Sequence, residues 1–170
     1  VDEVLKGDFD AKKFEEAKAK REEASKKLEE AFESAYSAKD YEKALKAADG
    51  LLASDAKKHK TLNIFKYMAL AKTGKGPEAK AFGASLVEKF AGEQEMLNHL
   101  AWTIVDPEGE IPAEARDADL AIAAANKGVE ATKGKDAAIM DTLARAYFVK
   151  GDLAKAIETQ TKAVEAADDD

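Results

Sequence analysis

The sequence predicts an all-α protein, an α-solenoid built from about four antiparallel helix pairs. The first supporting observation is an internal repeat, because the segment 119 to 131 aligns with the segment 153 to 166 so that Ala121 falls on Ala156, 35 residues later. The second is the position of the helix-breaking residues. The chain has only 3 prolines, and its glycines fall mostly between segments whose apolar residues recur at helical spacing. A repeat at this spacing is typical of helix pairs that bury an apolar face against their neighbours.

The first halves of the same two units also align, but with a different offset. LAWTIV, which starts at Leu100, aligns with LARAYFV, which starts at Leu143, an offset of 43 residues. The eight additional residues (43 minus 35) form one segment, DPEGEIPA. We therefore expect an insertion between the two helices of the third unit.

The first helix is expected over residues 11 to 37 and is unusually long for one member of a pair. Three pairs on its surface place an acid four residues before a base, and each adds about 0.3 kcal/mol: Glu16 with Lys20, Glu22 with Lys26, and Glu23 with Lys27. Its apolar side chains recur at three- and four-residue steps and form one stripe: Phe14, Ala17, Ala24, Leu28, Ala31, Phe32 and Ala35.

The next three helices are marked by caps and breakers. Asp40 is expected to cap a helix that reaches Leu52, and another helix is expected from His59 to Lys72. Pro77 suits the first turn of the fourth helix. Gly92 is expected to end that helix in a left-handed conformation.

The second half of the chain is expected to contain four further helices. The first runs from about residue 93 to 105, and Pro112 is expected to open the second, which reaches about residue 133. The last pair is expected over 137 to 149 and 152 to 167, with Asp152 as the cap of its second helix. The three aspartates at 168 to 170 lie at the negative end of that helix, so we expect this tail to fray.

The last unit resembles the tetratricopeptide repeat, which implies a right-handed solenoid. The residues that match the pattern of that family, in the required order, are Leu143, Ala144, Tyr147, Gly151, Ala156 and Ala163. The chain departs from the pattern at Gln160, where an aromatic residue is usual, and at Asp168, where proline is usual.

The alanine of the second helix marks each unit, and Ala44, Ala79, Ala121 and Ala156 give four units within a single domain spanning 1 to 170. The approximate units are 11 to 56, 59 to 92, 93 to 133 and 136 to 168. In the second unit, Gly74 with Ala79 and Gly76 with Ala81 both satisfy the glycine-to-alanine spacing, so two registers remain open. The first unit lacks the turn glycine and has Phe32 where a small residue is expected, which suits an atypical terminal repeat.

A second resemblance covers the third and fourth units. LNHLAWTIVDPEG, followed by a long helix and MDTLARAYFVKGDLAKAI, is similar to the C-terminal repeat region of bacterial redoxin proteins of the planctomycete type. VDEVLKGDFD looks like the seam after a thioredoxin-like domain. This resemblance implies an accessory domain of a thiol-disulfide redoxin, with a periplasmic or exported location for such a parent. The chain has no cysteine, so the thiol chemistry of that family has no residue here.

Composition narrows the classes of partner. The 27 basic and 34 acidic residues give a formal charge of −7, which opposes binding to a phosphate backbone. No apolar run approaches the ~20 residues that cross a bilayer, and residues 1 to 12 lack the pattern of a signal peptide. We therefore expect a protein or peptide partner or a second copy of the chain, with neither nucleic acid nor membrane insertion.

In a stack of helix pairs, the first helices line a groove, and their side chains outside the packing stripe face it. Asn98 and Asp141 occupy equivalent positions in the third and fourth units, as do Trp102 and Arg145. Trp102 either packs against the inserted turn or contacts a partner, and Arg145 pairs with an acid of the partner or of its own chain. The predicted groove residues are Asn98, Trp102, Val105, Asp141, Arg145 and Phe148.

The sequence predicts no catalytic, cofactor or metal site. His59 and His99 have no metal-binding spacing around them. The cluster of Asp106, Glu108 and Glu110 departs from a calcium loop because Ile111 stands at its glycine position and Asp117 at its glutamate position. KTGKGPEAK lacks phosphate-loop spacing and is expected to be a turn between helices. We therefore expect a non-catalytic interaction module, with the accessory redoxin domain as the alternative.

Overall fold

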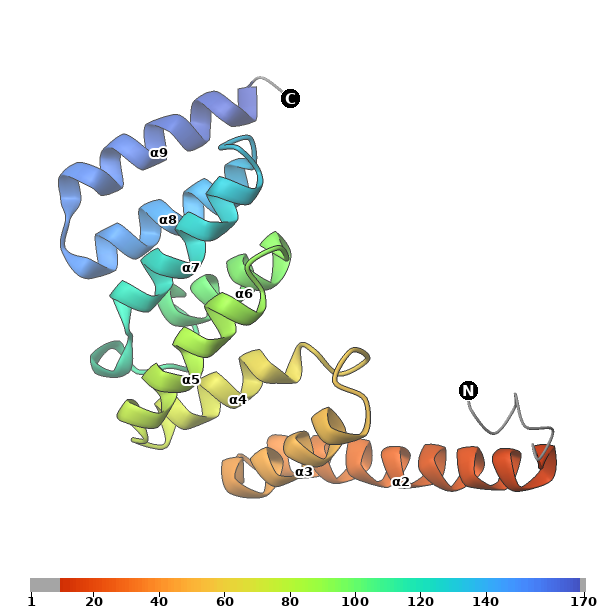
Figure 1. Ribbon diagram of the computed structural model, residues 1–170. Coiled ribbons are helices and arrows are strands. Elements are labelled where there is room, and N and C mark those ends of the chain that lie inside the picture. The colour runs from red at the N-terminus through yellow and green to blue at the C-terminus, as the bar shows by residue number, and fades with distance from the viewer. Residues whose placement is uncertain (1–9, 169–170) are drawn as a thin grey trace. The chain divides into compact units, whose positions relative to one another are not determined.

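The computed structural model describes residues 10–168, and within that range it contains eight α-helices, one short 3-10 turn and no β-strand (Figure 1). The predicted all-α class is thus confirmed. The chain divides into two compact parts with the boundary between Lys60 and Thr61. These parts are called unit 1 and unit 2 below and are distinct from the four repeat units expected from the sequence. A single domain over 1 to 170 stays a prediction. The predicted seam at the N-terminus falls almost entirely outside the described residues, as do Asp169 and Asp170 of the tail.

Unit 1 is a hairpin of two helices, α2 (Ala11–Ser37) and α3 (Tyr41–Ser54). Each begins after an aspartate whose carboxylate accepts a backbone N–H three residues on, at 3.1 Å for Asp10 and 3.1 Å for Asp40. Such caps satisfy N–H groups that have no partner inside the helix. The predicted bounds of α2 and the capping role of Asp40 are confirmed.

The first half of α2 has little cover. Residues 11 to 24 are exposed, and Ala35 is the buried residue of this helix. Of the predicted surface pairs, the one between Glu23 and Lys27 is present, with Oε1 of Glu23 2.7 Å from Nζ of Lys27. Lys26 lies 4.0 Å from Glu30 instead of pairing with Glu22. The helical pattern of the sequence therefore holds where tertiary packing contributes little.

Unit 2 contains α4 (Leu62–Lys72), α5 (Gly76–Lys89), α6 (Gln94–Val105), the 3-10 turn η1 (Ala113–Ala115), α7 (Ala118–Ala131), α8 (Ala137–Lys150) and α9 (Leu153–Asp168). Helix α6 packs against α4, α7 and α8, while α7 also contacts α5 and α8, and α9 packs against α8 (Figure 1). Tyr67 lies in the core of this unit, and its burial, with a smaller contribution from the charge of Asp117, raises the pKa of its hydroxyl above the usual range.

Three expected helix boundaries are wrong. The third helix begins at Leu62 and not at His59, because the Asp55 carboxylate accepts the backbone N–H groups of Lys57 and Lys58, at 3.0 and 2.9 Å, and holds a turn there. The fourth helix ends at Lys89, and the chain turns at the buried Phe90, so Gly92 does not serve as a left-handed terminator.

The third wrong boundary lies after the inserted turn. Pro112 has an extended backbone and precedes η1 instead of opening the sixth helix. That helix begins at Ala118, because the Asp117 carboxylate accepts the N–H of Leu120 at 3.0 Å. An aspartate that satisfies an orphan N–H is a stronger start than a proline that only tolerates the position.

Three helix pairs close with the same turn. Lys39, Gly74 and Gly151 have φ of 58°, 77° and 87°, and the N–H that follows each donates to a carbonyl five residues earlier. The three bonds measure 2.9, 3.0 and 2.9 Å, from Asp40 to Ala35, Lys75 to Leu70 and Asp152 to Tyr147. The same backbone geometry therefore recurs in both units.

The marker alanines are structurally equivalent. Ala44, Ala79, Ala121 and Ala156 are each the fourth residue of their helix, and none is more than 8% exposed. Ala81, by contrast, is exposed. Of the two registers left open for the second repeat unit, this burial favours Gly74 with Ala79.

The turn of unit 1 leads to a stability prediction. Lys39 takes a left-handed conformation that costs a residue with a Cβ about 1 kcal/mol relative to glycine. Lys39→Gly should therefore stabilise the α2–α3 hairpin by roughly 0.5–1 kcal/mol, measured by hydrogen exchange of its amide groups. Lys39→Ala is the matched control, since it removes the same side chain and keeps the Cβ. Equal effects of the two substitutions would contradict the strain argument.

Candidate functional site

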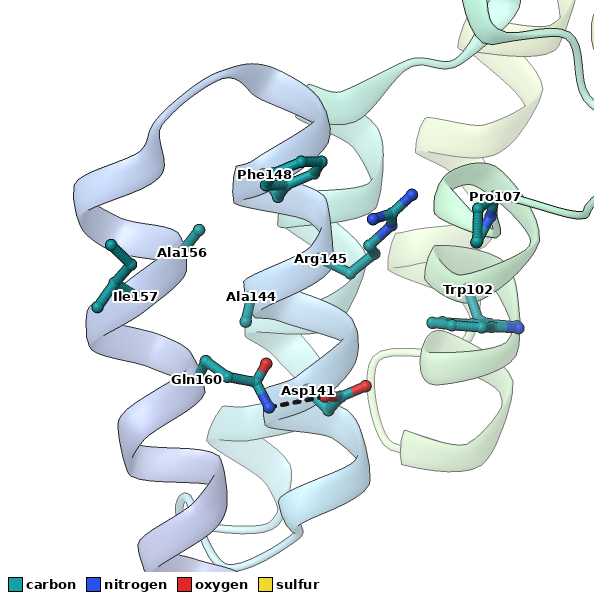
Figure 2. Close-up of a pocket in the computed structure, with 9 residues that line it drawn as sticks. All are labelled: Trp102, Pro107, Asp141, Ala144, Arg145, Phe148, Ala156, Ile157 and Gln160. Atoms are coloured by element: carbon teal, nitrogen blue, oxygen red, sulfur yellow. Dashed lines mark hydrogen bonds between the residues drawn. The ribbon is translucent and has the colours of Figure 1, made fainter.

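Two adjoining hollows lie in unit 2 along α8. The first encloses about 410 Å³ and the second about 480 Å³, and they share Trp102, Asp141 and Gln160. We call them together the α8 groove. Its lining comes from α6, α8 and α9 and from Pro107 in the inserted turn, and the first hollow is drawn in Figure 2. The complete lining is Asn98, Trp102, Pro107, Ala137, Ala138, Asp141, Thr142, Ala144, Arg145, Phe148, Ala156, Ile157, Gln160, Ala163, Val164 and Ala167.

Five of the six predicted groove residues line these hollows, namely Asn98, Trp102, Asp141, Arg145 and Phe148. Val105 does not, because its side chain is fully buried at the end of α6. What Val105 offers is its backbone carbonyl, which accepts a hydrogen bond from Arg145 Nε at 3.3 Å. This bond ties α8 to the C-terminal end of α6, where helix carbonyls lack partners within the helix.

Arg145 is the positive charge of the groove. Its guanidinium carbon lies 5.1 Å from the centre of the Phe148 ring, within range for a cation–π contact. Figure 2 shows its side chain between Phe148 and Pro107. The sequence left two acids open as the partner of Arg145, one from its own chain and one from a bound protein. Within residues 10–168 Arg145 forms no ion pair, so the first of these is not found there.

Asp141 is the negative charge of the groove and lies one helical turn before Arg145. Its Oδ1 accepts a hydrogen bond from Gln160 Nε2 of α9 at 2.8 Å, the dashed line of Figure 2. Asp141 and Arg145 do not pair with each other, although a spacing of four residues permits this on a helix. The groove therefore presents two separate charges of opposite sign.

Trp102 lies where both roles expected from the sequence are open to it, packing against the inserted turn and contact with a partner. Its side chain lies near Pro107 of the inserted turn and also lines both hollows, opposite α9 (Figure 2). The residue is 39% exposed. An indole held at the edge of a hollow by its own helix can serve as an anchor for a bound chain.

Sequence reasoning missed the contribution of α9. Ile157, Gln160 and Val164 line the groove from its far side, and Ile157 is 68% exposed. The marker alanine and Ala163 already supply the buried face of α9. Leu153, Ile157 and Val164 lie outside that buried face. These additional aliphatic residues were the sign in the sequence that α9 has a second apolar surface.

The other residues considered from the sequence lie apart from the groove. His59 is buried in unit 1, with its Nε2 3.9 Å from Oε1 of Glu29, and His99 is exposed on α6. In the inserted turn, Glu110 pairs with Lys72 of α4, and Asp106 accepts the N–H of Glu108 at 3.0 Å. KTGKGPEAK spans the turn between α4 and α5, as expected. Within residues 10–168, no group of three potential metal ligands occurs.

Comparisons with known proteins give no assignment: no protein-family model matches the chain, and no curated protein matches it. Among the helices between residues 10 and 168, none has both the length and the apolar character needed to cross a membrane.

Proposed function

We propose that this protein is a non-catalytic interaction module whose α8 groove binds a peptide segment of another protein. We also propose that the helix pairs of unit 2 form a right-handed α-solenoid of the tetratricopeptide type. Equivalent burial of Ala79, Ala121 and Ala156 and the contacts of α6 with α4 and α8 support that arrangement. Repeats stacked in this way create extended grooves that are suited to holding another chain.

The observation that carries the binding proposal is the exposed apolar lining of the α8 groove. Trp102, Phe148 and Ile157 are 39%, 53% and 68% exposed and lie around one hollow. Clustered apolar side chains rimmed by polar groups mark sites of interaction with a partner. Small residues, Ala144 and Ala156, form part of the hollow between them and leave room for a side chain of the partner.

A peptide suits this lining better than a compact small molecule. The two hollows adjoin, so the groove is elongated along α8 instead of forming one enclosed cavity. Its few polar groups are separated by apolar surface, which matches a chain that presents side chains and main-chain polar groups at intervals. The accessory redoxin role stays a second prediction from the sequence.

The test combines selection of peptides with a double substitution. Peptides selected from a random display library on the immobilised protein should change the fluorescence of Trp102, the only tryptophan of the chain. Trp102→Ala together with Arg145→Ala should weaken their binding by roughly 30- to 100-fold, since a central aromatic and an arginine are typical hot spots. For the variant, a fluorescent label on the peptide gives the affinity.

The matched control is His99→Ala, on the same helix as Trp102 but outside the hollows. It should leave the affinity unchanged, and circular dichroism should show full helicity in all variants. Loss of helicity in the double variant would assign both residues to the core. Selected peptides that bind the double variant as tightly as the wild type would show that the groove is not the site.

A further inference from the structure

The α8 groove contains two charged side chains of opposite sign, and each is held in place by its own neighbours. Asp141 is exposed beside Gln160, and Arg145 is half-buried beside Phe148. The two residues lie one turn apart on α8, a rise of about 6 Å. Each is held by a different neighbour, Asp141 by α9 and Arg145 by the end of α6, so neither charge neutralises the other.

An apolar partner is disfavoured by this arrangement. Covering the groove would remove water from both charges, and a charge that loses water without gaining a partner weakens binding. A purely acidic partner would bring a carboxylate onto Asp141, and a purely basic partner would bring a cation onto Arg145. The partner that avoids all three penalties carries one charge of each sign.

A second observation concerns the end of the groove near Asn98. Its Oδ1 is shielded from water and has no hydrogen-bond partner within residues 10–168. Because that oxygen is shielded from water, it is not open to a partner either. Asp141, which lines both hollows, supplies the exposed acceptor oxygens of the groove, while Arg145 supplies N–H donors. Donor groups of a partner therefore belong at Asp141 and acceptor groups at Arg145.

We infer that the groove selects an extended peptide segment with a basic side chain against Asp141, an acidic side chain against Arg145, and apolar side chains against Trp102 and Ile157. An extended chain advances about 3.3 Å per residue and points alternate side chains to the same face. The basic and acidic residues should therefore be two positions apart, about 6.6 Å. This inference rests on the proposed function and names the chemistry of its partner.

The experiment uses the peptides selected on the wild-type protein, each synthesised with its acidic residue as such or replaced by glutamine. The glutamine peptide should bind the wild type about five- to tenfold more weakly, the range expected for a partly buried charge pair. Against Arg145→Gln, the two peptides should bind equally. Asp141→Asn should remove the preference for the basic residue in the same way, and Arg21→Gln, an exposed arginine of unit 1, is the matched control.

The outcomes separate the two proposals. Selected peptides that need Trp102 but show no charge preference, or a preference that Arg145→Gln leaves intact, would overturn this inference and leave the groove as the binding site. Peptides that bind without any dependence on Trp102 or Arg145 would overturn both. If light scattering shows a dimer that Trp102→Ala dissociates, and no peptide displaces the second copy, the occupant is the chain itself and the inference is wrong.

Discussion

Gly83→Val should destabilise unit 2 by about 3 kcal/mol, at the upper end of the usual cost of overpacking a core. Gly83 is a buried residue of α5 that faces side chains of α4 and α7. A Cβ at this position would lie 2.3 Å from Cδ2 of Leu120 and 2.8 Å from Cε2 of Tyr67. The Leu120 side chain can rotate, but the Tyr67 ring is 1% exposed and cannot move into solvent without displacing its neighbours.

The measurement is urea unfolding followed by the fluorescence of Trp102, which lies in unit 2 and therefore reports on that unit. Gly92→Val is the matched control, because a Cβ there meets nothing within 4 Å and its φ is not left-handed. The control should change the free energy of unfolding by no more than about 0.5 kcal/mol. If both variants unfold at the same urea concentration, the close approach of the helices is not what requires glycine at position 83.

The position of Gly83 also explains why the fold was easier to predict than its packing. The offset of 35 residues identified the marker alanines, and the structure places Ala121 and Ala156 in the same position of their helices. That offset reports local periodicity, which any chain of equivalent hairpins shares. Gly83, by contrast, is small because two side chains from other helices occupy its space, and a single sequence contains no direct record of that contact.

The start of the sixth helix was predicted wrongly, at Pro112 instead of after Asp117. Pro112 was expected to open this helix, and the capping role of Asp117 was not predicted. The structure starts the helix after Asp117, because the segment before it is held by the burial of Ile111 in unit 2. The Asp117 cap and the packing of the insertion thus together set the start of this helix.

The candidate site was predicted in part for a related reason. Equivalence between the third and fourth repeat units paired Asn98 with Asp141 and Trp102 with Arg145, and in the structure these four residues line the two hollows. The same equivalence failed for Val105, because the inserted turn follows it directly and the end of α6 is covered. An offset between repeats predicts a position on a helix, whereas exposure depends on what the following residues cover.

Ile111→Ala should destabilise unit 2 by roughly 2–4 kcal/mol, the usual cost of removing most of a buried aliphatic side chain. Ile111 is 1% exposed and is the buried side chain of the segment DPEGEIPA, whose other residues are exposed or half-buried. Arg116 holds the same segment, with its Nε donating to the carbonyl of Ile111 at 3.2 Å and Nη2 to that of Pro107 at 3.4 Å. Loosening this anchor should also displace Pro107 from the edge of the α8 groove.

The matched control for this substitution is Ile157→Ala, which removes the same atoms from a residue that is 68% exposed. It should change the free energy of unfolding by less than about 0.5 kcal/mol, since little apolar surface is returned to water. If Ile111→Ala costs as little as the control, while hydrogen exchange speeds up only in residues 106 to 117, the insertion opens as a separate local unit. In that case the insertion borders the groove without stabilising the helices around it, and affinity for the selected peptides should still fall because Pro107 no longer closes the first hollow.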